Sequence, residues 1–285
     1  MSSPVRAGLL RLRKDFHHGS SWYYAQGISL LARAVPREIP AVISQLRSVR
    51  PGMAPLENLS AVVEAAQHSG RDIGQTLERL EAQRRRAQER VLGVMGRRTF
   101  GKVLTLSYSS AVLGAARSGA IEEVHLLESQ PGTESRAAFR DYSRFVPVTM
   151  VPDAIGGSLL GAVDTLLVGC DGIFAAGGVV NKSGSLGLAR AAAAEHVPVR
   201  VVGESYKFSR TLPQLTQSRN LKIWGQRVKV PLLEAVPLRY VASITTDVGT
   251  LRKPDPASVL RHHREYWDSV FPRNIQKAVN QLRNP

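Results

Sequence analysis

Short apolar runs alternate with segments of helical spacing over residues 99–250, and this alternation constrains the fold more than any other feature of the chain. The runs have the length and composition of buried strands, and they lie at 103–106, 124–127, 146–151, 166–168, 173–176 and 199–202. Helical segments follow at 111–117, 135–142, 154–163 and 186–195. Such alternation is typical of a parallel sheet with helices on both faces. We therefore predict an α/β fold with a Rossmann-like parallel-sheet domain over 99–285.

The ends of this sheet region are less regular in sequence. Residues 209–235 read as an irregular segment with basic residues, and a last strand is expected near 240–244. Two helices, near 256–269 and 273–283, are expected to complete the chain.

The first 98 residues have a different pattern, which predicts a separate N-terminal helical domain. Apolar residues recur at helical spacing in four segments, at 22–32, near 43–46, at 56–66 and from about 72 into an arginine-rich stretch. Pro36, Pro40 and the Pro51-Gly52 pair separate these segments, because proline ends a helix.

Composition narrows the class of protein. The chain has 285 residues and one cysteine, Cys170, which excludes an internal disulfide and fits a reducing compartment. No run approaches the roughly 20 apolar residues of a membrane helix, and the N-terminus has no secretory apolar core. The adjacent pairs at 17–18 and 262–263 are read as surface histidines. We expect a cytoplasmic protein without membrane contact, metal site or cofactor.

The net charge of +15 invites a nucleic-acid interpretation. The basic residues are dispersed, however, with one local concentration from Arg84 to Arg98. Aromatic residues make up 6% of the chain and do not interleave with this segment, so no base-stacking surface is evident. A solvated helix face and a contact with RNA or an acidic protein both remain open for this segment.

Residues 164–185 are the strongest candidate for a binding site. An apolar strand ends near Asp171, and a glycine-rich segment then leads through Asn181 and Lys182 into an alanine-rich helix. The unpaired N–H groups and the dipole of a helix start favour a phosphate group, and lysine adds a positive charge. A helix cap at Asn181 and a solvated Lys182 are the alternative interpretation.

Polar residues also follow the other predicted strands, at the sheet edge where ligands of such folds bind. We expect one shared pocket for a phosphorylated small molecule, with candidate residues Ser107, Ser109, Glu128, Gln130, Gly177, Gly178, Asn181, Lys182 and Lys207. Ser107 and Ser109 can also act as helix N-caps, and Lys207 can form an ion pair with Glu204 instead of binding a ligand.

Three motifs carry a resemblance to a known family. GCDGIFAAGGVVNKSGS at 169–185, VVGESYKF at 201–208 and TTDVGTL at 245–251 resemble the α, β and δ regulatory subunits of eukaryotic translation initiation factor 2B. Relatives of that family are ribose-1,5-bisphosphate isomerase and methylthioribose-1-phosphate isomerase. The resemblance implies a helical domain before a Rossmann-like domain, and homodimers that assemble into hexamers. It also adds Gly19 and Ser20, in an N-terminal glycine motif, to the expected binding residues.

The resemblance bears on catalysis as well. The isomerases resemble one another in using a cysteine after the first strand as acid or base, paired with an aspartate. Their cysteine position is Ser107 here, and a serine hydroxyl is far less acidic than a thiol. The aspartate of one isomerase branch is kept as Asp171, that of the other falls on Gly178, and an arginine of both falls on Gln130.

These comparisons favour a protein like the alpha subunit of initiation factor 2B, regulatory or weakly catalytic, which binds a sugar phosphate or a nucleoside monophosphate. Its expected partners are further copies of the chain, translation-factor subunits or RNA. A divergent phosphosugar aldose–ketose isomerase that uses Asp171 is the alternative, and an RNA-associated protein that uses residues 84–98 is the second alternative.

Overall fold

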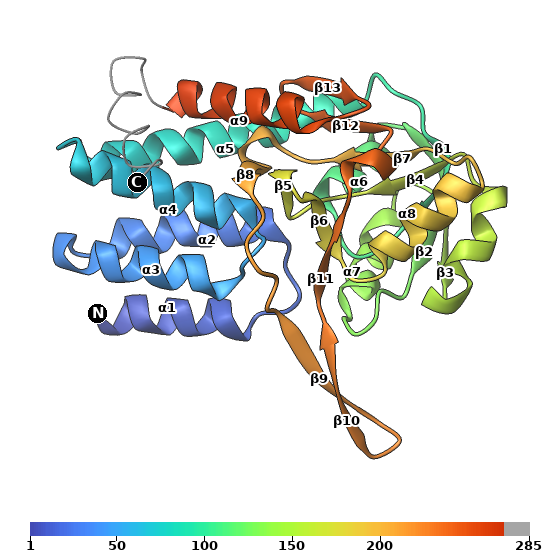
Figure 1. Cartoon of the computed structure of the whole chain (residues 1–285), viewed down its shortest axis with the longest axis horizontal. Coiled ribbons are helices and arrows are strands. Elements are labelled where there is room, and N and C mark those ends of the chain that lie inside the picture. Colours follow the sequence, from blue (N-terminus) through green and yellow to red (C-terminus); the bar gives the residue numbers. More distant parts are fainter. Residues whose placement is uncertain (271–285) are drawn as a thin grey trace.

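A computed structural model describes residues 1–270 of the chain. A helical part occupies one end of the molecule, and a part built around β-sheets occupies the other (Figure 1). The helix expected at 273–283 lies outside the described residues.

The first hundred residues are helical, as predicted. Their helices are α1 (Ser3–Lys14), α2 (Ser20–Arg33), the 3-10 helix η1 (Pro36–Glu38), α3 (Ile39–Val49), α4 (Ala54–His68) and α5 (Ile73–Met95). Helix α1 was not predicted. The start of α5 is fixed by Asp72, whose carboxylate accepts a hydrogen bond from the backbone N of Gln75 at 2.7 Å.

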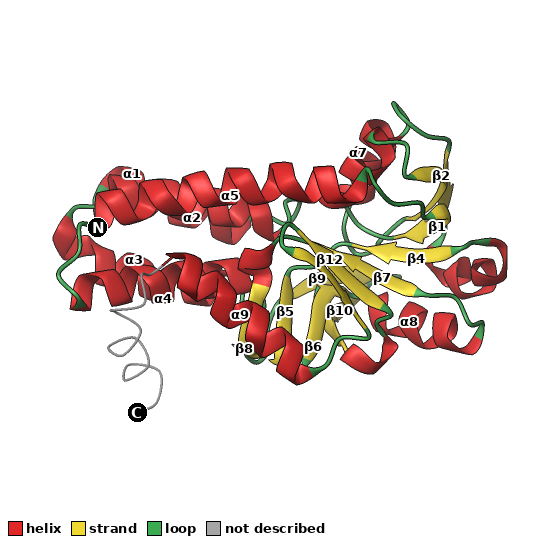
Figure 2. Cartoon of the chain, turned by 90° about the horizontal axis from the view of Figure 1, so that it is seen from above, coloured by secondary structure: helices red, strands yellow, loops and turns green. Residues whose placement is uncertain are grey.

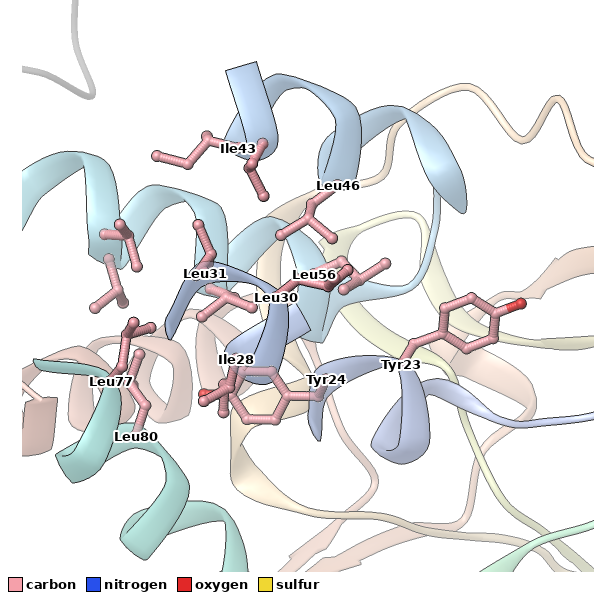
Figure 3. Packing of buried hydrophobic residues seen from close by; sticks show 14 of the residues in the cluster. Tyr23, Tyr24, Ile28, Leu30, Leu31, Ile43, Leu46, Leu56, Leu77 and Leu80 are labelled. Carbon is pink, nitrogen blue, oxygen red and sulfur yellow. The ribbon is translucent and has the colours of Figure 1, made fainter. Parts of the chain in front are cut away.

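Apolar side chains of α2 to α5 form one buried cluster (Figure 3). Leu31, Leu46 and Leu56 of this cluster are each at most 1% exposed, and burying such a side chain contributes about 1.5–3 kcal/mol. The C-terminal helix α9 (Pro256–Val270) adds Tyr266 and Trp267 to the same cluster. Residues from both ends of the described chain therefore build the core of the helical part.

The main sheet has seven strands. They are β1 (Gly101–Thr105), β2 (Ile121–Leu127), β3 (Val148–Val151), β4 (Thr165–Val168), β7 (Val199–Val202), β12 (Ser243–Thr246) and β13 (Gly249–Arg252). Their order is β13-β12-β7-β4-β1-β2-β3, and all neighbours are parallel except β12 and β13. Numbered along the chain, the six parallel strands have the order 3-2-1-4-5-6 of doubly wound dinucleotide-binding sheets, which reverses direction between β1 and β4.

Both faces of this sheet are covered (Figure 2). Val103 belongs to a cluster with α5, α6 (Ser110–Arg117) and α7 (Glu134–Tyr142), whereas its neighbour Leu104 belongs to one with α8 (Ser185–Ala194). Such alternation follows from the two-residue period of a strand. The helix predicted at 154–163 is instead a 3-10 helix, η2 (Asp153–Ala162), whose three glycines have low α-helical propensity.

One predicted strand lies in a different sheet. The run at 173–176 is β5 (Gly172–Ala176), which pairs with β6 (Gly178–Lys182). Together with β8 (Phe208–Thr211) and β11 (Leu233–Val236), they form a second sheet in the order β11-β6-β5-β8. The chain turns back at Gly177, where φ is +141°, so the two strands are antiparallel. No other residue fits at Gly178, where a Cβ would lie 2.1 Å from the carbonyl oxygen of Val236.

The segment expected to be irregular, 209–235, contains strands. These are β8 (Phe208–Thr211), β9 (Ser218–Ile223), β10 (Gln226–Pro231) and β11 (Leu233–Val236). Strands β9 and β10 form a hairpin around Trp224 and Gly225, whose φ values are +48° and +87°. A tryptophan is an unusual residue for this position, so the sequence lacked the common Asn-Gly turn signal. The strand expected near 240–244 lies at Ser243–Thr246, after a 3-10 turn, η4 (Leu238–Tyr240), and β13 follows it in the chain.

Within residues 1–270, no helix combines the length and the hydropathy that crossing a membrane requires.

Candidate functional site

A pocket of about 670 Å³ opens at the carboxyl ends of β1 and β4, where the strand order reverses. Ligands of open α/β sheets bind at this point, and the volume is in the range of about 300–1,000 Å³ found for small-molecule sites. Its walls come from residues 106–110 after β1, residues 169–171 after β4 and residues 16–23 at the start of α2. The pocket therefore lies between the helical part and the main sheet.

Most of the predicted binding residues line this pocket, namely Gly19, Ser20, Ser107, Ser109, Asp171, Asn181, Lys182 and Lys207. Glu128, Gln130, Gly177 and Gly178 are not part of its lining. Glu128 and Gln130 are exposed on the loop after β2, and the two glycines form the turn between β5 and β6. The Gly-Gly pair therefore shapes the second sheet and does not cradle an anion.

Lys182, at the end of β6, is 7% exposed and lies in an ion pair. Its ammonium is 2.7 Å from Oε1 of Glu134, the first residue of α7, which is 6% exposed. A Cβ on Gly132 would lie 1.7 Å from Oε2 of Glu134, so only glycine leaves room for this carboxylate. Lys182 is therefore not the solvated lysine of the alternative interpretation, and a carboxylate of the chain itself holds the anion position beside it.

Asn181, the residue before Lys182, has a local role. Its Nδ2 donates to Oγ of Ser185 at 3.1 Å, and that hydroxyl donates to the backbone carbonyl of Lys182 at 2.6 Å. These bonds join the end of β6 to the start of α8. The amide still lines the pocket, so a local role and ligand contact are compatible.

Lys207 forms the ion pair that was the alternative to a ligand contact. Its ammonium is 2.9 Å from Oε2 of Glu204, and both side chains are less than 10% exposed. Burial alone would lower the pKa of Lys207, but its neighbours, chiefly the Glu204 carboxylate with Cys170 and Asp171, together outweigh burial and raise the pKa above its ordinary value. Lys207 therefore stays charged at neutral pH.

The backbone around Lys207 is held from two sides. Asp247, in the TTDVGTL motif, accepts hydrogen bonds from N and Oγ of Ser205 at 2.6 and 2.9 Å. Asn58 of α4 donates to the carbonyls of Tyr206 and Phe208, both at 2.9 Å. The short 3-10 helix η3 (Ser205–Lys207) is thus fixed by both the helical part and the sheet part.

Asp171 lies opposite the start of α2. Its Oδ1 accepts a hydrogen bond from the backbone N of Ser20 at 3.1 Å, and the helix dipole favours a carboxylate there. Burial nevertheless raises the pKa of Asp171, and the charge of Lys207 opposes this shift only in part. Asp171 accepts backbone bonds as a turn residue does, and it also has the raised pKa that a proton-exchanging carboxylate requires.

Ser107 and Ser109 have different roles. Ser109 is the N-cap of α6, since its Oγ accepts from N of Val112 at 3.3 Å. Ser107 is no cap, and its φ of +63° is uncommon for a residue other than glycine. Its N donates to Oγ of Ser129 at 2.6 Å, and its Oγ donates to Oε1 of Glu134 at 3.0 Å. The hydroxyl is thereby aligned on the same carboxylate that pairs with Lys182.

Cys170 is an inert thiol by environment. It is 5% exposed, and burial raises its pKa to about 12. A thiol of that pKa carries almost no thiolate at neutral pH. Cys170 is therefore a structural residue of the core and not a nucleophile.

The mouth of the pocket is aromatic and basic. His18 stacks on Trp22 with ring centroids 4.2 Å apart, and Arg50 lies over the ring of Phe16 at 4.5 Å. His17 also lines the pocket, so the pair at 17–18 is exposed, as predicted, but not remote from the site. His263 was expected at the surface and is 3% exposed, because α9 packs on the helical part.

The charges define what the pocket can bind. Its lining includes two lysines, three arginines, three carboxylates (Glu134, Asp141 and Asp171) and several hydroxyls. Within residues 1–270 no group of three His, Cys, Asp or Glu side chains is arranged for a metal ion. Paired ammonium and carboxylate groups can donate to and accept from the hydroxyls of a sugar. The helix starts and the lysines can hold an anionic group.

Comparison with known proteins decides the family. The sequence profile of the Initiation factor 2 subunit family matches residues 26–253. The chain belongs to this family. The α subunit of translation initiation factor eIF2B from Caenorhabditis elegans is 32% identical over 165 residues, which are 53% of this chain and 54% of that protein. The chain thus matches about half the length of that relative.

Family members with enzymatic names are similar to the chain too. The ribose 1,5-bisphosphate isomerase of Archaeoglobus fulgidus is 29% identical over 167 residues, 52% of this chain and 53% of that protein. Among solved structures, the translation initiation factor eIF-2B of Pyrococcus horikoshii has a TM-score of 0.79 at 24% identity, covering 89% of this chain and 98% of that one. This likeness shows the shared fold, α/β with helices before a mostly parallel sheet. The family therefore contains both initiation-factor subunits and phosphosugar isomerases.

Sequence reasoning did not find Glu134, although it named Ser129 among the polar residues after the strands. The contact between Glu134 and Lys182 joins the start of α7 to the end of β6, and no local pattern in the sequence predicts it. The only available signal was proximity to Gln130, which was predicted for the site although it is not part of the lining.

Proposed function

We propose that the chain binds a sugar phosphate or a nucleoside monophosphate in this pocket and acts as a regulatory subunit like the α subunit of eIF2B, with weak catalysis or none. The observation that carries the proposal is the convergence of Lys182 and Lys207 on one pocket at the reversal point of the sheet. Both ammonium groups are held in place by carboxylates, so they are oriented before a ligand arrives.

The same geometry argues against efficient isomerase chemistry. Proton transfer between adjacent carbons needs a group that exchanges protons near neutral pH. The hydroxyl of Ser107 is a poor donor of that kind, and the pKa of Cys170 is about 12.

A phosphosugar aldose–ketose isomerase is the second candidate, and the raised pKa of Asp171 favours it. In that function Asp171 moves the proton and Ser107 positions a hydroxyl or a water. The relation to ribose 1,5-bisphosphate isomerase agrees with this candidate.

Assembly is part of the proposal. A solved structure of similar fold, with a TM-score of 0.65 and 12% identity, is the tetrameric eIF2B-beta2-delta2 complex of C. thermophilum. We propose that this chain likewise assembles, as a homodimer or hexamer or with translation-factor subunits, in the cytoplasm. Ligand binding would shift assembly by its differential affinity for the two states.

A thermal-shift screen with ribose 1,5-bisphosphate, methylthioribose 1-phosphate and AMP tests the proposal. A ligand that binds the native state raises the apparent melting temperature. We expect a shift without turnover, and its loss in Lys182→Ala. Turnover of either sugar phosphate that disappears in Asp171→Asn would establish the isomerase instead, and no shift with any ligand would refute both functions.

A further inference from the structure

Among the strands of residues 1–270, β9 and β10 pair only with each other. This hairpin projects from the sheet part into solvent (Figure 1), and its base adjoins the pocket, which Gln217 and Leu232 help to line. Trp224, at its tip, is 100% exposed. A two-stranded hairpin without a covered face is only marginally stable in water. A projecting hairpin with an exposed indole is therefore a surface that a partner can cover.

The pairing register sorts its side chains onto two faces. Lys222 lies opposite Arg227, and Asn220 lies opposite Lys229, so these four residues share one polar face. The other face carries Leu221, Ile223, Val228 and Val230 together with Gln226 and with Arg219, whose guanidinium donates to the carbonyl of Pro131 at 2.8 Å. Trp224 lies in the turn that joins the two strands. The hairpin thus presents cations on one side and, near its tip, a mainly apolar surface on the other.

The charge of this region has one sign. Residues 208–233 contain Arg210, Arg219, Lys222, Arg227 and Lys229 and no aspartate or glutamate. In the arginine-rich helix α5, by contrast, Glu81 pairs with Arg84 and Arg85, each at 2.7 Å. The hairpin region therefore has no carboxylate of its own to offset its cations, whereas the arginine-rich helix is ion-paired in part.

We propose that the hairpin β9–β10 binds single-stranded RNA. Lys222, Arg227 and Lys229 contact phosphates, and Trp224 stacks on a base at the tip. A single strand offers both an anionic backbone and apolar base faces, which matches the two sides of the hairpin. For this surface a second copy of the chain, which also carries a net charge of +15, is electrostatically a poorer match than RNA. RNA is favoured over an acidic protein because Trp224 projects fully exposed from the tip, where its ring can stack on a base.

Fluorescence anisotropy with a labelled 12-nucleotide oligouridine tests this, using the full chain at several salt concentrations. The variants are Trp224→Ala and the triple variant Lys222→Gln/Arg227→Gln/Lys229→Gln. A triple variant of exposed arginines on α5, Arg85→Gln/Arg86→Gln/Arg90→Gln, is the matched control with the same change in charge. All substituted residues are exposed, so each variant should melt like the wild type.

We expect Trp224→Ala to weaken binding about 10-fold, since one stacked base contributes about 1–3 kcal/mol. The hairpin triple variant should reduce the slope of log K against log salt by about 2, which is three phosphate contacts at about 0.7 each. The α5 control should leave the slope less changed. Equal losses in both triple variants, or no effect of Trp224→Ala, would overturn the proposal. Competition by poly-glutamate as strong as by RNA would identify an acidic-protein surface and overturn it as well.

Discussion

Replacing Glu134 by glutamine tests whether this carboxylate competes with an anionic ligand for the ammonium of Lys182. The ammonium of Lys182 and the carboxylate of Glu134 are 2.7 Å apart, and both side chains are less than 10% exposed. An anionic ligand at Lys182 must share that ammonium with Glu134 or displace the carboxylate. In the variant this competition is gone, so the unliganded protein should be less stable and the ligand should bind more tightly.

The magnitudes follow from the burial of the pair. Removing one partner of a buried ion pair costs about 3–5 kcal/mol, because the remaining charge is uncompensated. Glutamine keeps the shape and one oxygen of the side chain, so we expect the lower end, about 3 kcal/mol. For a chain of this size that corresponds to a melting temperature lower by about 6 °C or more. A phosphate that restores the lost interaction should bind about 10- to 100-fold more tightly than in the wild type, which is about 1.4–2.8 kcal/mol.

Calorimetric titration with ribose 1,5-bisphosphate, together with thermal melting of the unliganded variant, measures both effects. Glu128→Gln is the matched control, since Glu128 is an exposed glutamate in the segment between β2 and α7. It should change neither quantity. Unchanged or weaker ligand binding by Glu134→Gln, or an unchanged melting temperature, would refute the argument that this carboxylate occupies an anion position.

Three further predictions concern the elements around the pocket. Gly178→Ala should lower the free energy of unfolding by about 3 kcal/mol or more in urea titrations, because φ is +96° and a Cβ would lie 2.1 Å from the carbonyl oxygen of Val236. The control Gly187→Ala, in open space on α8, should be neutral or stabilising, and equal effects of the two substitutions would contradict this prediction. Cys170 should resist iodoacetamide at pH 8 in the native state, since burial raises its pKa to about 12, and it should react once the chain is unfolded in urea. Fast alkylation of the native protein would show an accessible thiolate and contradict this prediction. Burial raises the pKa of Asp171 above its unfolded value, so the wild type loses stability as pH rises through the folded pKa. Asp171→Asn should therefore have a higher melting temperature than the wild type at pH 7, and this difference should shrink below the pH at which unfolded aspartates protonate. A lower melting temperature of the variant at pH 7 would contradict the direction of the shift.

The α/β architecture could be predicted because buried parallel strands are continuous apolar runs in the sequence. Such runs can be identified without knowing which strands pair with each other. The runs before Ser107 and Asp171 are of this kind, and they fix the reversal point at which the pocket lies. The same logic assigned 173–176 to the main sheet, which was wrong, since the turn at Gly177 sends the chain back antiparallel. A run of apolar residues shows burial but not which sheet buries it.

The candidate site was predictable where strand ends supply it and not where distant loops meet. Lys182 and Lys207 were predicted as residues that follow strands, but only one of their two carboxylate partners could be predicted. Glu204 is three residues from Lys207 and was anticipated, whereas Glu134 begins α7, which only the tertiary fold brings to Lys182. The glycines at 177–178 were read as an anion cradle because a glycine-rich segment has the same sequence whether it turns a strand or approaches a phosphate.

The most direct test of the account is calorimetric titration of the wild type and Lys182→Met with ribose 1,5-bisphosphate. The account predicts saturable binding of one ligand per chain in the wild type and none in the variant. Since Lys182→Met leaves Glu134 buried and unpaired, Lys182→Met/Glu134→Gln provides a variant in which both charges are removed, and it too should not bind. Equal affinity of the wild type and this double variant would contradict the claim that Lys182 holds the phosphate.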